Sequence, residues 1–129
     1  MDTRDKIIDS SRAAAMVAAL RSRGSALKVV TGYFDILIAE HVRRLRNIAC
    51  GADAVFVMVL DPPDPVLGAR ARAELVAACG VVDYVVPSGE GTSQTLLSLF
   101  MADEIVREES ADLLRLRRLT EHVQRRNQQ

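Results

Sequence analysis

Apolar and polar residues alternate along the chain in two kinds of segment. Four short segments are rich in β-branched and other apolar residues, as buried strands are: 27–31, 54–60, 81–86 and, more weakly, 104–107. Around them, apolar residues recur at helical spacing over 3–23, 40–50, 67–79, 92–101 and 111–127. Strands that alternate with helices predict right-handed crossovers. We therefore expect an α/β fold, a Rossmann-like three-layer sandwich with a parallel sheet of four or five strands.

The loops that follow the predicted strands are the candidate site. In an open parallel sheet, ligands bind beyond the carboxyl ends of the strands. These ends are followed by the segments 32–38, 61–65, 87–91 and 107–110, and residues 88–91 are expected to form a turn. The second segment, Asp-Pro-Pro-Asp-Pro, predicts a rigid loop because proline restricts the backbone.

The composition narrows the class of protein. The 129 residues fit one domain, 1–129, and a hydrophobic fraction of 49% supplies a core. Lys plus Arg and Asp plus Glu both number 17, so the net charge of +0 offers no general attraction to nucleic acid or anionic membranes. The longest apolar runs are too short to span a bilayer, and no signal-type segment follows the amino terminus. We expect a cytoplasmic protein that binds neither nucleic acid nor membrane.

A motif after the first predicted strand is similar to that of a known family. The stretch KVVTGYFDILIAEHVRRLRNIACGADAVFVMVL, 28–60, resembles the opening of the cytidylyltransferase-like nucleotidyltransferases. It is most similar to the nucleotidyltransferase domain of the bifunctional heptose-phosphate kinase/adenylyltransferases. That family carries Gly-x-Phe-Asp-x-x-His-x-Gly-His, and Gly32, Phe34, Asp35 and His41 stand at matching positions. Segments 69–87 and 92–107 also resemble the family.

The resemblance implies a reaction and a set of site residues. In the family, a substrate phosphate attacks the α-phosphorus of a nucleotide and pyrophosphate leaves, with no protein nucleophile. The resemblance implies CTP or ATP and a phosphorylated small molecule as partners. It also implies Mg²⁺ if the chain is active, and a homodimer is expected. His41 is the implied catalytic residue. The implied nucleotide-binding residues are Gly32, Tyr33, Phe34, Asp35, Ile38, Glu40, Arg44, Asp61 and Arg107.

The departures from the family pattern fall on phosphate-handling positions. Ile38 replaces the first motif histidine and Glu40 replaces its glycine. No lysine follows the second strand, and the loop after the fourth reads Arg-Glu-Glu-Ser instead of Lys-Gly-Gly-Asp. Loss of one donor to a developing negative charge costs roughly 10²–10³-fold in rate. A carboxylate at a helix start also occupies the position where an anion is stabilised. Weak or absent catalysis is therefore expected.

Several alternatives stay open. His41 either donates to a phosphate or hydrogen-bonds within the start of its helix. Structural roles are expected for Asp35, through backbone amides, for Phe34 in the core and for Gly32 in a tight turn. Asp61 with Asp64 either binds a divalent cation or belongs to a surface loop. The arginines of the last helix are expected to face solvent: Arg115, Arg117, Arg118, Arg125 and Arg126.

Three functions are compatible with these observations. The first is a nucleotidyltransferase-fold protein with weak or no catalysis, and the second is an active nucleotidyltransferase. The third is a structural or dimerisation partner. The fold is common to all three, so the site has to distinguish them.

Overall fold

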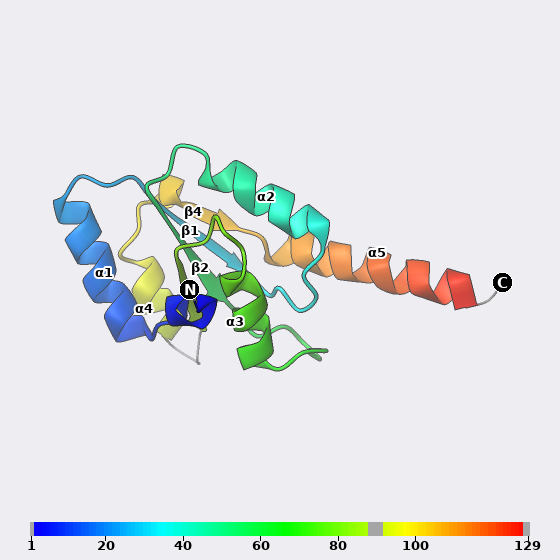
Figure 1. Ribbon diagram of the computed structural model, residues 1–129. Helices are drawn as coiled ribbons and strands as arrows, with labels where there is room; N and C mark the ends of the chain where they lie inside the picture. Colours follow the sequence, from blue (N-terminus) through cyan, green and yellow to red (C-terminus); the bar gives the residue numbers. More distant parts are fainter. Residues whose placement is uncertain (1, 88–91, 128–129) are drawn as a thin grey trace.

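The computed structural model of the chain describes residues 2–87 and 92–127. Strands and helices alternate as the sequence predicts, and the turn expected at 88–91 lies outside the described residues. Figure 1 shows the elements in chain order: η1 (Thr3–Lys6), α1 (Ser10–Ser22), β1 (Leu27–Gly32), α2 (Ala39–Ala49), β2 (Ala54–Val59), α3 (Ala69–Ala77), β3 (Tyr84–Pro87), α4 (Thr92–Leu97), η2 (Ala102–Glu104), β4 (Ile105–Arg107) and α5 (Glu109–Asn127).

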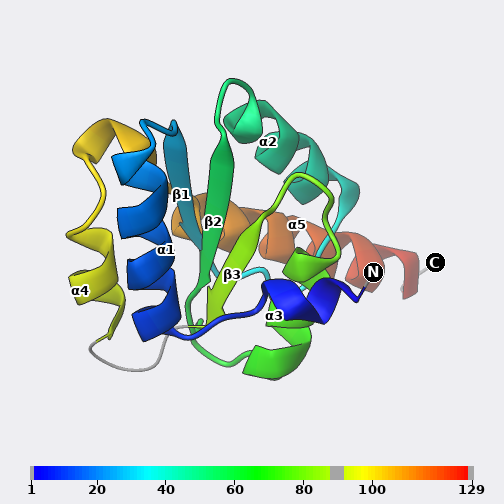
Figure 2. The same ribbon diagram turned by 60° about the vertical axis from the view of Figure 1, so that its left-hand side comes forward.

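The four strands form one parallel sheet in the order β3-β2-β1-β4. All six residues of β2 are buried, as its continuous apolar sequence predicts. Helices α1 and α4 lie on one face of the sheet, and α2, α3 and α5 lie on the other (Figure 2). The predicted Rossmann-like α/β sandwich is thereby confirmed.

Each face of the sheet has its own apolar core. On the α2 and α3 face, Phe34 and Leu45 pack with valines of β1 and β2. On the α1 and α4 face, Phe56 lies between the rings of Tyr84 and Phe100. Phe34 is 2% exposed, which confirms its expected place in the core.

The prediction of one helix over 3–23 is wrong at residues 7–9. Ile7 forms a parallel bridge with Val85, and the N–H of Ile8 donates to the carbonyl oxygen of Val85 at 2.9 Å. These two residues cover the outer edge of β3, so their backbone cannot be helical. Asp9 then starts α1, because its carboxylate accepts the N–H of Arg12 at 2.7 Å.

The short strand β4 brings the start of α5 to the end of β1. Thr31 pairs with Arg107 in register, and the N–H of Glu108 donates to the carbonyl oxygen of Thr31 at 2.7 Å. The turn before β4 is fixed by Arg21 of α1, which donates to Glu104 at 2.9 Å and lowers the pKa of that carboxyl. The first turns of α5 therefore lie beside the loop that follows β1.

Helix α5 extends away from the sheet at its carboxyl end (Figure 1). Residues 120–127 are all exposed, including the apolar Val123. Within residues 2–87 and 92–127, no helix combines the length and the apolar character that a membrane crossing requires.

Candidate functional site

The loop after β1 directs two successive backbone N–H groups at one point. Phe34 has a φ of 49°, in the left-handed region that costs an L-residue about 1–2 kcal/mol. In this conformation the N–H groups of Tyr33 and Phe34 both donate to Oδ2 of Asp112, at 2.8 and 3.2 Å. Adjacent N–H groups that converge in this way form a concavity that binds anions.

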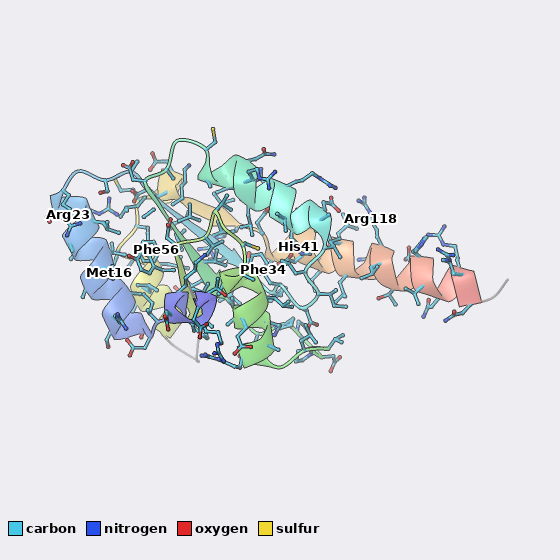
Figure 3. The ribbon with its side chains drawn as sticks, viewed as in Figure 1. Met16, Arg23, Phe34, His41, Phe56 and Arg118 are labelled. Atoms are coloured by element: carbon cyan, nitrogen blue, oxygen red, sulfur yellow. The ribbon has the colours of Figure 1, made fainter. Side chains whose placement is uncertain are left out.

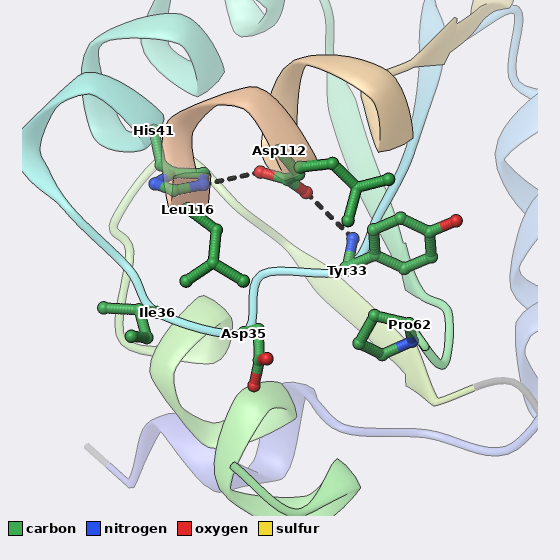
Figure 4. A pocket seen from close by; sticks show the side chains of 8 residues that line it. Tyr33, Asp35, Ile36, His41, Pro62, Asp112 and Leu116 are labelled. Carbon is green, nitrogen blue, oxygen red and sulfur yellow. Dashed lines mark hydrogen bonds and ion pairs between the residues drawn. The ribbon is translucent and has the colours of Figure 1, made fainter. Parts of the chain in front are cut away.

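His41, in the first turn of α2, completes this concavity. Its Nδ1 accepts the N–H of Ile38 at 3.1 Å, so the proton of the neutral ring lies on Nε2. The Nε2–H then donates to Oδ1 of Asp112 at 2.5 Å (Figure 4). The ring is 4% exposed, and both of its nitrogens have partners within the protein. We call the N–H groups of Tyr33 and Phe34 together with Nε2 of His41 the cradle.

Asp112 comes from the first turn of α5 and fills the cradle. Its side chain is 3% exposed and both of its oxygens accept hydrogen bonds from the cradle. The adjoining cavity holds about 10 Å³, close to the space of a single water molecule. Its lining includes the apolar residues Ile36, Pro62 and Leu116. A phosphate group has no room beside the carboxylate.

The cations near the cradle are matched by carboxylates. The Arg115 guanidinium lies 3.5 Å from Asp112 and 3.8 Å from both Glu40 and Glu108. Arg44 donates from Nε to Glu108 at 2.8 Å. The expectation that Arg115 faces solvent is wrong, since its side chain is 9% exposed. The reason is that the helix packs this turn, with its acidic partners, against β1 and α2.

On the other side of the cradle, two acidic residues hold loops in place. The carboxylate of Asp35 accepts the N–H groups of Val66 and Leu67 at 2.8–3.0 Å, which confirms its expected structural role. Asp61 accepts from the buried Arg72 at 2.8 Å. Asp61 is thus used in an ion pair and not gathered with Asp64 around a cation site.

The structure brings six of the ten predicted site residues together around Asp112 and the cavity beside it. Gly32, Tyr33, Phe34 and His41 surround Asp112, and Ile38 contributes only its backbone N–H. Asp35 lines the cavity beside Asp112, while its carboxylate accepts the N–H groups of Val66 and Leu67. Glu40 contacts the site through Arg115, and Arg44 contacts it through Glu108. Asp61 in its loop and the exposed Arg107 at the end of β4 lie farther away.

Two residues of the site were not foreseen from the sequence, Asp112 and Arg115, and Glu108 was included only as part of the candidate loop 107–110. Asp112 precedes Leu116 by one helical turn and Leu119 by two, so it shares their inward face. An acidic residue on the packing face of a helix is the sequence feature that could have indicated the buried role of Asp112. Among the described residues, no group of three or more His, Cys, Asp or Glu side chains could hold a metal ion.

The sequence of the chain is similar to sequences of known proteins. No family model matches the chain. The bifunctional protein HldE of Aeromonas hydrophila is 36% identical over 100 residues, which cover 70% of this chain and 21% of that protein. HldE of Mesorhizobium japonicum is 34% identical over 113 residues, 81% of this chain and 23% of that protein. The chain is a homologue of the HldE proteins. The predicted resemblance is therefore confirmed.

A solved structure supports the same conclusion for the fold. The lipopolysaccharide core biosynthesis protein from Thermoplasma volcanium GSS1 superposes with a TM-score of 0.54 and 21% identity, covering 64% of this HldE homologue and 95% of that chain. The homologue spans about a fifth of the length of the curated HldE relatives. The comparisons thus support a nucleotidyltransferase-like fold.

Proposed function

We propose that the HldE homologue is a non-catalytic member of the nucleotidyltransferase fold, a module that keeps the scaffold without transferring a nucleotidyl group. One observation carries this proposal: the Asp112 carboxylate accepts all three N–H groups of the cradle. An internal anion already has the hydrogen bonds that a nucleotide phosphate requires. Nucleotide binding at this place requires the displacement of Asp112.

The charge balance of the site supports the same proposal. Nucleotidyl transfer gains its rate from groups that stabilise negative charge on the phosphates. Here Arg115 and Arg44 face the carboxylates of Glu40, Glu108 and Asp112. These acids oppose the entry of a triphosphate, because like charges at a few ångströms repel in a poorly solvated site.

Mg²⁺ does not fit this arrangement. Acidic side chains are present, but those of Asp112, Glu108 and Glu40 are engaged by an arginine, a histidine or backbone N–H groups. We therefore derive no step through a metal ion. The homodimer and the cytoplasmic location stay predictions from the sequence, as do the nucleotide and the phosphorylated small molecule as partners.

A turnover assay tests the proposed function. The purified homologue is incubated with ATP or CTP, Mg²⁺ and a panel of sugar phosphates, and released pyrophosphate is measured. An HldE protein assayed in parallel is the positive control, and circular dichroism verifies that the homologue is folded. We expect pyrophosphate release at the no-enzyme background with either nucleotide. Release that depends on both nucleotide and sugar phosphate would establish the active alternative.

A further inference from the structure

We infer that the cradle is a functional oxyanion site whose present ligand is the carboxylate of Asp112, and that a small free carboxylate takes its place when this side chain is removed. The inference rests on the proposed function, because both place Asp112 in the cradle. The inference adds a ligand class for the three donors of the cradle, namely planar carboxylates of the size of formate. It also makes the first turns of α5 the element that closes the site.

The donors of the cradle are positioned by elements other than α5. Tyr33 and Phe34 follow β1, and the left-handed φ of Phe34 turns its N–H toward the site. His41 belongs to α2, and the N–H of Ile38 fixes its ring through Nδ1. The ring of Phe34 is buried in the core beside His41, at a centroid separation of 5.9 Å. Removal of the Asp112 side chain therefore leaves all of these constraints in place.

The emptied site offers unpaired hydrogen-bond donors to an anion. Asp112 lies 3.5 Å from the buried guanidinium of Arg115. Without Asp112, that cation retains Glu40 and Glu108 only at 3.8 Å, and the three N–H groups of the cradle lose their acceptor. A small carboxylate would restore an acceptor to these three buried donors and would replace the carboxylate neighbour that Arg115 has lost.

The space selects the size of the ligand. The cavity beside Asp112 adds about 10 Å³ to the volume that the carboxylate vacates, and Leu116 and Ile36 bound it with apolar groups. Formate reproduces the planar two-oxygen geometry of the lost side chain. Acetate adds a methyl group, and phosphate is larger in every direction. We expect the order formate, then acetate, then phosphate.

The experiment measures the thermal unfolding of Asp112→Ala in rising sodium formate, with sodium chloride at equal ionic strength as the reference. The variant is expected to unfold at a lower temperature than the native chain. Formate is expected to raise its unfolding temperature by several degrees with a saturable dependence, since a ligand of the folded state stabilises it by mass action. The native chain and the exposed-acid control Asp103→Ala should respond to formate as they do to chloride.

Three further measurements strengthen this test. Asp112→Asn keeps the cradle filled, so it should lose stability without any recovery in formate. If Asp112→Ala does not fold alone, its refolding yield in formate against chloride becomes the measurement. In the ¹⁵N-labelled Asp112→Ala variant, formate should shift the amide resonances of Tyr33 and Phe34. An equal response of Asp112→Ala to formate and to chloride would overturn the inference. The proposed function is tested separately, by pyrophosphate release from the native chain.

Discussion

Replacement of Gly32 by alanine is expected to lower the free energy of unfolding by about 3 kcal/mol, as overpacking and lost hydrogen bonds combine. A Cβ at this position would lie 2.6 Å from Oδ2 of Asp112 and 2.7 Å from Cε2 of Phe34. Neither neighbour can yield easily. The Asp112 carboxylate is held by the cradle, and the Phe34 ring is buried in the core. Glycine is therefore required here for close approach, and not for the tight turn that the sequence suggested.

Urea unfolding of Gly32→Ala against Gly80→Ala measures this effect. No atom lies within 4 Å of a Cβ built at Gly80, so that variant should stay within about 0.5 kcal/mol of the native chain. Equal stability of the two variants would mean that Asp112 does not lie against Gly32. The comparison thus reports on the filled cradle as well as on stability.

The Arg72→Ala variant is expected to lose about 4 kcal/mol, because a buried hub of hydrogen bonds disappears. Arg72 is 1% exposed. Its Nη1 donates to the carbonyl oxygens of Leu60 and Tyr33, at 2.6 and 3.2 Å. Its remaining nitrogens donate to the carbonyl oxygen of Leu67 and to Asp61, at 3.1 and 2.8 Å. The residue therefore ties together the loops that follow β1 and β2 and the start of α3.

A neighbouring arginine provides the control for this prediction. Arg70 pairs with Glu74 on the exposed surface of α3, where a salt bridge contributes little. Arg70→Ala should therefore change the free energy of unfolding by less than about 0.5 kcal/mol. Arg72→Lys should fall between the two, since the three donors of an ammonium sit on one nitrogen and cannot reach all four acceptors that the wider guanidinium serves. Arg70→Ala and Arg72→Ala variants of equal stability, in chemical denaturation, would contradict the assigned role.

The sequence was informative about the order of elements. The continuous apolar run of β2 and the helical spacing around it are local patterns, so strand and helix types could be predicted from them. The break at Ile7 and Ile8 could not, because it depends on pairing with Val85, far away along the chain. Short-range periodicity carries no signal for such a contact.

The motif departures located the site but not its present ligand. Ile38 and Glu40 indicated a weakened phosphate site, and they lie at the start of α2 as expected. The sequence placed Glu40 in the site, yet its carboxylate is 49% exposed and faces Arg115. The carboxylate that does fill the cradle belongs to α5, which looked like a charged surface helix. Its position depends on the pairing of β4 with β1, a long-range feature.

Isothermal titration calorimetry with ATP and CTP in the presence of Mg²⁺ tests the central claim most directly. The native chain and the Ile38→His, Glu40→Gly double variant are titrated side by side. The double variant restores the family motif at both positions but leaves Asp112 in the cradle. A filled cradle predicts no saturable heat at millimolar nucleotide for either protein. Saturable binding of one nucleotide per native chain would contradict it.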